Sequence, residues 1–65
     1  MMKPQKIRAL LIENKEKQID IARALGVQPS SVGMAIDNKF VSRRIREAIA
    51  EKARVPFETM WGKAA

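Results

Sequence analysis

The chain has 65 residues, with no cysteine and no histidine. A chain this short forms one small domain, and the missing residue types exclude disulfide bridges, thiolate metal sites and histidine-based catalysis. Thirteen Lys and Arg residues against seven Asp and Glu residues leave a formal net charge of +6, and the isoelectric point is about 10.4. An excess of this size favours a polyanionic partner, nucleic acid foremost.

No targeting segment or membrane span is expected. The longest apolar stretch near the start, Ala9 to Ile12, is bounded by Arg8 and Glu13. A signal peptide needs an apolar run of about 7–15 residues and a membrane helix one of about 20. The sequence therefore predicts a cytoplasmic protein without membrane contact.

The first expected helix covers residues 4–14. Its apolar residues Ile7, Leu10 and Leu11 recur at spacings of three and four, as they do on one face of a helix. Pro4 stands at the first helical position, where its missing N–H would have no partner within the helix. The polar residues that follow predict a turn.

Two short helices are expected next, over residues 17–25 and 29–37. Gly26 follows the first of them, where a helix commonly ends in a left-handed conformation. Pro29 opens the second, so the connection consists of only the three residues from Gly26 to Gln28. So short a connection forces a sharp turn between the two helices.

The remaining chain predicts two further helical segments. Ser42 is expected to cap a helix over residues 43–53, which the pair Val55-Pro56 ends. Phe57 and Trp61 then stand four residues apart in a last helical turn and are expected to pack inward. No strand pattern or repeat appears. The predicted fold class is therefore all-α, a compact bundle of four to five short helices in a single domain of residues 1–65.

The stretch from Gln18 to Asp37 holds the main functional signal. Ala22 is small where the two short helices must pass closely, and Gly26 takes the sharp turn that residues with a Cβ resist. The apolar residues expected to seal the core between them are Ile21, Leu25, Val27, Val32 and Ile36. This pattern is typical of a helix-turn-helix, whose second helix lies in the major groove of DNA.

A family resemblance rests on Gln18, Ala22, Leu25-Gly26-Val27 and Ser31-Val32-Gly33. These residues resemble the lambda-repressor-like family of DNA-binding domains. The flanking segments match that family's order of five short helices, and a tryptophan shortly after Val55-Pro56 is similar to the small phage Ner-type regulators. The resemblance covers close to the whole chain. It implies a transcription regulator of the phage or prophage repressor and Cro type.

Docking as in that family would turn the outer face of the third helix toward the bases. The residues expected on this face are Gln28, Ser30, Ser31, Gly33, Met34 and Asp37. A glutamine amide suits adenine, serine hydroxyls suit bases or phosphates, and a flexible apolar side chain suits the thymine methyl. Gly33 is expected to allow close approach, although a glycine merely tolerated in a helix is the alternative. Gln18 resembles a family glutamine that contacts phosphate and supports the recognition helix.

Two positions depart from the family pattern. Pro29 stands where relatives commonly have a base-reading polar residue. Asp37 brings a negative charge near DNA, and is expected to cap the helix end or to pair with Lys39 or Arg43. The base preference of a relative therefore does not transfer to this chain.

A basic cluster directly follows the third helix. Its cations are Lys39, Arg43, Arg44 and Arg46, within eight residues and with no acid before Glu47. They are expected to contact phosphates beside the groove, together with Asn38 in the same loop.

The sequence thus predicts a sequence-specific double-stranded DNA-binding repressor, a homodimer at least on a pseudo-palindromic operator, with no cofactor, metal or small-molecule ligand. An antitoxin or anti-repressor is the alternative, which would bind a protein through Phe57 to Trp61 or through Ile12 and Ile19. RNA binding or non-specific binding by charge is a third reading, disfavoured by the few aromatic residues. The sequence has no nucleophile–base pair and no phosphate-binding loop, so nothing in it indicates an enzyme.

Overall fold

The computed structural model describes residues 1–62, and these residues form five helices and no strand. The helices are α1 (Pro4–Glu13), α2 (Gln18–Leu25), α3 (Pro29–Ile36), α4 (Arg43–Ala53) and α5 (Phe57–Trp61). The all-α prediction is confirmed, and every helix end lies within one residue of its expected place. The predicted domain extends to residue 65, so its last three residues lie outside the described part.

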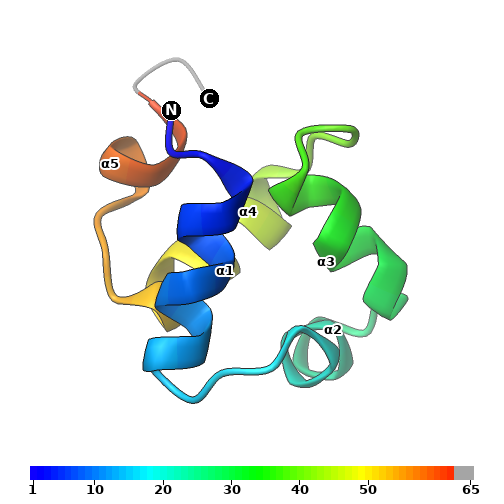
Figure 1. The fold of residues 1–65 in the computed structure, drawn as a ribbon. Coiled ribbons are helices and arrows are strands. Elements are labelled where there is room, and N and C mark those ends of the chain that lie inside the picture. Colours follow the sequence, from blue (N-terminus) through cyan, green and yellow to red (C-terminus); the bar gives the residue numbers. More distant parts are fainter. Residues whose placement is uncertain (63–65) are drawn as a thin grey trace.

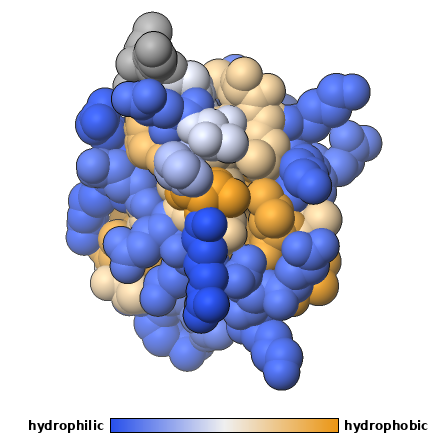
Figure 2. All heavy atoms as spheres, turned by 90° about the vertical axis from the view of Figure 1, so that its left-hand side faces the viewer, coloured by the Kyte–Doolittle hydropathy of each residue, from blue (hydrophilic) through white to orange (hydrophobic). Residues whose placement is uncertain are grey.

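The helices pack as one bundle. In Figure 1, α1 and α4 occupy the centre, α2 and α3 lie together on one side, and α5 closes the opposite side. Figure 2 shows the α5 side, where hydrophilic side chains cover most of the face and hydrophobic ones reach the surface near its middle. None of the helices within residues 1–62 has the length and apolar character needed to cross a membrane.

Local rules account for most helix ends. Pro4 and Pro29 are the first residues of α1 and α3. The hydroxyl of Ser42 accepts a hydrogen bond from the Ile45 amide at 3.4 Å, which confirms the predicted cap of α4. Arg54 ends α4 in the left-handed region at φ 61°, directly before Val55-Pro56.

The connection between α2 and α3 has the predicted sharp turn. Gly26 lies in the left-handed region, with φ 70° and ψ 32°. The Val27 amide donates to the Ala22 carbonyl at 3.0 Å, which ties the turn to the last turn of α2. Ala22 is fully buried, as the close passage of two helices requires. α2 and α3 are therefore two packed helices joined by a sharp turn of three residues.

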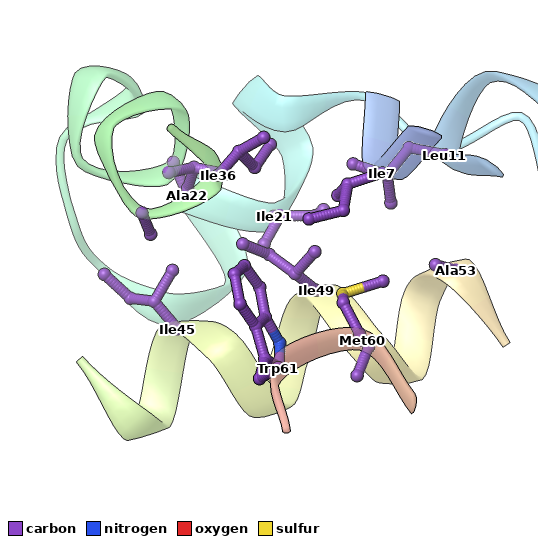
Figure 3. Close-up of a cluster of buried hydrophobic side chains, with 13 residues drawn as sticks. Ile7, Leu11, Ile21, Ala22, Ile36, Ile45, Ile49, Ala53, Met60 and Trp61 are labelled. Atoms are coloured by element: carbon purple, nitrogen blue, oxygen red, sulfur yellow. The ribbon is translucent and has the colours of Figure 1, made fainter. Parts of the chain in front are cut away.

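The core draws side chains from all five helices (Figure 3). Its largest fully buried members are Ile7, Leu11, Ile21, Val32, Ile36, Ile49 and Met60. Burying one such side chain contributes about 1.5–3 kcal/mol relative to leaving it in water. Because α3 buries Val32, Ala35 and Ile36 here, its opposite face is directed outward.

Trp61 holds α5 against α4. Its side chain is 2% exposed, which confirms that it packs inward. The indole Nε1 donates to the Arg46 carbonyl at 2.9 Å, and the Arg46 guanidinium lies 4.7 Å from the centre of the indole ring. Phe57 is half-buried, and the Arg43 guanidinium lies 4.6 Å from its ring centre.

Candidate nucleic-acid interface

The outer face of α3 is exposed and uncharged. Ser30 is exposed, Met34 is 40% exposed, and Ser31 and Gly33 are half-buried beside them. None of these side chains belongs to the core. Hydroxyls that donate and accept, next to a flexible thioether, match the mixed polar and methyl surface of a major groove.

The start of α3 adds a carboxamide to this face. Gln28 occupies the N-cap position in extended backbone conformation, and it is exposed. Its side chain makes no capping hydrogen bond, so the helix end does not use the carboxamide. Pro29 follows. Because proline has no N–H, the start of α3 has one unpaired backbone donor fewer.

Gln18 and Gly33 lie against each other, although they come from different helices. A Cβ placed on Gly33 would lie 3.5 Å from Gln18 Oε1, which is an ordinary contact distance. Gln18 thus rests on α3, as expected of a residue that supports this helix. The fold has room for alanine at position 33, so packing within the protein does not require the glycine.

Asp37 is the C-cap residue of α3, as one of the predicted alternatives has it. Its carboxylate pairs with Arg8 of α1, which corrects the alternative of a pair with Lys39 or Arg43. The two Arg8 Nη atoms donate to the two carboxylate oxygens at 2.8 and 3.2 Å. These hydrogen bonds lower the pKa of Asp37 from its ordinary value and raise that of Arg8. The acid at the end of α3 is therefore held in an ion pair. The partners are 29 residues apart, and no local sequence signal identifies Arg8.

The basic cluster divides into surface and interior members. Lys39, Arg43 and Arg44 are exposed. Arg44 also donates to the Leu25 carbonyl at 2.8 Å, and Arg43 lies 3.8 Å from Glu47. Arg46 is only 4% exposed, so its predicted phosphate contact is wrong. The reason is its packing over the indole ring described above.

Asn38 fixes the loop after α3. It adopts the left-handed region at φ 61°, and its Oδ1 accepts a hydrogen bond from Arg46 Nη2 at 2.7 Å. The Lys39 amide donates to the Met34 carbonyl at 2.9 Å. The loop that begins with Asn38 and Lys39 is thus tied both to α3 and to the interior.

The start of α4 is basic. The first two residues of α4 are Arg43 and Arg44, and no acid stands in that first turn. The amide end of a helix already favours anions, so these cations cost some helix stability and strengthen attraction for phosphate. Asp37, already paired, is the only acid between Asp20 and Glu47.

Two other features of the described residues bear on function. Over residues 1–62, no cluster of acidic side chains is arranged to hold a metal ion. An open hollow beside α1 is lined by Arg8, Leu11, Ile12, Glu16, Lys17 and Gln18. Ile12, one of its walls, is 74% exposed.

Comparison with family models, with curated proteins and with solved structures finds no match to this chain. The resemblance to the lambda-repressor-like family therefore rests on the residues that suggested it.

Proposed function

We propose that this protein binds double-stranded DNA sequence-specifically, with α3 in the major groove, and regulates transcription as a repressor of the phage or Cro type. The observation that supports this most is the outer face of α3. It is uncharged and unused by the core, and Ser30 and Met34 on it are exposed. An α-helix fits the major groove, which is about 12 Å wide.

The chemistry of each side chain indicates which part of the DNA it would contact. Gln28, Ser30, Ser31 and Met34 contact base edges, and Gly33 permits close approach of the helix. Lys39, together with the helix starts of α2 and α4, contacts the backbone on either side. Roughly 3–5 phosphate contacts per protein would give a salt slope near −0.9 for each.

Two copies on one operator are part of this proposal. A single short helix makes few base contacts, and specific recognition by such modules uses two half-sites about one helical turn apart. The operator is therefore expected to be pseudo-palindromic, with a homodimer at least on DNA.

Alanine substitutions on α3 test the proposal after a duplex has been selected from a random pool. We expect Ser30→Ala and Met34→Ala each to weaken binding to the selected duplex by about 1–3 kcal/mol, while binding to unrelated duplex stays unchanged. Thr59→Ala is the matched control, because Thr59 is exposed on the distant helix α5. Retention of the same sequence preference by both α3 variants would exclude groove reading by α3.

A protein-interaction module is the second candidate, and one observation favours it. Trp61 is buried, so the aromatic tail offers little surface, but Ile12 remains exposed at the hollow beside α1. Ile12 and Ile19, which are 74% and 48% exposed, are the apolar side chains that such a contact would use. Failure of the wild-type protein to select any duplex would make this candidate the better one.

A further inference from the structure

Arg46 is a buried cation without a carboxylate partner. Its side chain is 4% exposed, and none of the ion pairs formed within residues 1–62 includes it. Its Nε atom has no hydrogen-bond partner there, while its Nη2 atom donates to the neutral side-chain oxygen of Asn38. Burying a cation without an acid costs free energy, and an apolar side chain of similar size would fill the space without that cost. Stability alone therefore does not account for an arginine at this position.

The partner of this arginine, Asn38, lies where α3 ends. Its backbone is in the left-handed region at φ 61°, and its amide donates to the Ala35 carbonyl at 3.2 Å. The next amide, of Lys39, donates to the Met34 carbonyl at 2.9 Å. The hydrogen bond from Arg46 to Asn38 is 2.7 Å long, and its charged donor makes it stronger than a bond between neutral groups. Through Asn38, Arg46 thus holds the last turn of α3, which carries Met34.

Arg46 is itself held by α5. Figure 3 shows Trp61 pointing from α5 into the core. The indole N–H donates to the Arg46 carbonyl at 2.9 Å, and the guanidinium lies 4.7 Å from the centre of the indole ring. Trp61 therefore contacts both the backbone and the side chain of Arg46. A continuous series of contacts leads from α5 through α4 to the end of α3.

We propose that Arg46 is a positioning residue, which holds the end of α3 through Asn38 in the orientation that reads bases and does not itself contact DNA. The turn at Gly26 fixes the start of this eight-residue helix. Its end depends on Arg46 and on the Arg8–Asp37 pair. Groups that recognise a ligand must be held within about 0.5 Å of their productive geometry. This inference rests on the proposed function, and it gives Arg46 a role in the interior instead of a phosphate contact.

Hydrogen exchange in the free protein tests whether Arg46 holds the end of α3. Arg46→Met removes the donor and leaves an apolar side chain of similar length. We expect this variant to fold, because replacement of an uncompensated buried charge by an apolar side chain is often neutral or stabilising. The amides of Asn38 and Lys39 should exchange several-fold faster than in the wild type, while the amides of α1 keep their rates, because only the end of α3 opens.

DNA preference tests whether this position matters for recognition. At a temperature where the variant is fully folded, Arg46→Met should reduce the preference for the selected duplex over unrelated duplex by about 2-fold to 30-fold, the range for residues that act without touching the ligand. Lys52→Met is the matched control. It removes the same charge from α4, but Lys52 lies at a hollow beside Ala24 and Glu51. Its preference should equal that of the wild type.

Asn38→Gly removes the acceptor and leaves the buried core unchanged. Glycine adopts the left-handed conformation freely, so the backbone of the turn is retained. This variant should lose the same preference as Arg46→Met, and the double variant should lose no more than either single one. Losses that add in the double variant would mean that the two residues act independently, and would overturn the proposal. Asn38→Gly also provides the test if Arg46→Met does not fold.

The outcomes distinguish this inference from the proposed function. Wild-type preference in Arg46→Met and Asn38→Gly, with weakened Ser30→Ala and Met34→Ala, would overturn the positioning role and leave the α3 proposal standing. Faster exchange throughout α1 and α3, in proportion to a lower thermal midpoint, would show that Arg46 merely stabilises the fold, and would also overturn it. If the wild type selects no duplex, the proposed function itself fails, and the exchange rates still decide whether Arg46 holds the end of α3.

Discussion

The residues of α3 form two sets, one buried and one exposed. Val32 and Ile36 are fully buried, whereas Ser30 and Met34 are exposed and contribute little to the core. Substitution of the first set by alanine removes buried methyl groups and destabilises the protein. Substitution of the second should affect binding alone. The two properties are therefore separable in this helix.

A substitution at Gly33 is expected to separate protein stability from DNA binding most clearly. Gly33→Ala is expected to stabilise the protein by about 1 kcal/mol, because alanine is the better helix former and the new Cβ meets Gln18 only at an ordinary distance of 3.5 Å. Binding to the selected duplex should nevertheless weaken, since the methyl group would separate α3 from the bases. Urea unfolding and a binding titration measure the two effects. A stabilised variant with unchanged affinity would show that the glycine is merely tolerated.

The Arg8–Asp37 pair predicts a pH dependence of stability. Arg8 lowers the pKa of Asp37 from its ordinary value of 3.8. The pair therefore stabilises the folded state fully above pH 3.8, and this contribution is lost as the pH falls through the lower folded-state value. Asp37→Asn should be less stable than the wild type in urea at pH 7, with a smaller difference at pH 3. Asp20→Asn is the control for loss of an exposed carboxylate in a long ion pair, because Asp20 lies 3.9 Å from its partner Arg23. A difference that stays constant with pH would contradict the pair's role.

Residues governed by local rules were predictable, and those governed by distant partners were not. Pro29, Gly26 and Ser42 mark helix ends through their own backbone or side-chain chemistry, and each lies where the sequence puts it. Arg8 and Arg46 find partners in other segments. Their positive charge says nothing about whether a carboxylate, an indole ring or a phosphate will be that partner.

Among the helices, too, local sequence signals predicted some features, while features that depend on distant partners were missed. All five could be located from periodicity and end signals, because those signals lie within each helix. The packing of α5 against α4 was expected as well, but the contacts of Trp61 with the backbone and guanidinium of Arg46 were not. Those contacts also remove a cation from the surface, and Arg46 in turn ties Asn38 to the interior.

Trp61 is expected to decide whether α5 stays docked. Trp61→Ala should cost about 3–5 kcal/mol, a large share of the total stability of roughly 3–10 kcal/mol for a domain of this size. Trp61→Phe keeps most of the apolar ring but loses the hydrogen bond to the Arg46 carbonyl, which adds about 1 kcal/mol of destabilisation. Thermal unfolding followed by circular dichroism measures both.

Thr59→Ala is the control on the same helix, since Thr59 is exposed and should change stability by less than about 0.5 kcal/mol. A Trp61→Ala protein as stable as the wild type would mean that α5 is dispensable for the core.

The whole molecule combines a small core with an uneven charge distribution. The net charge of +6 attracts any polyanion, so it explains affinity without explaining sequence preference. Preference requires a surface that reads bases, and the exposed face of α3 is the proposed one. The distinction matters because charge-driven binding would involve lysines all over the surface, whereas groove reading concentrates contacts on one side.

An amide chemical-shift titration of labelled protein with a selected duplex tests this account most directly. We predict that the largest shifts fall on Gln18, on residues 28–34 and on residues 39–44, while α5 changes little. Shifts centred on Lys3, Lys6, Lys15 and Lys17, with residues 28–34 unaffected, would contradict the placement of α3 in the groove.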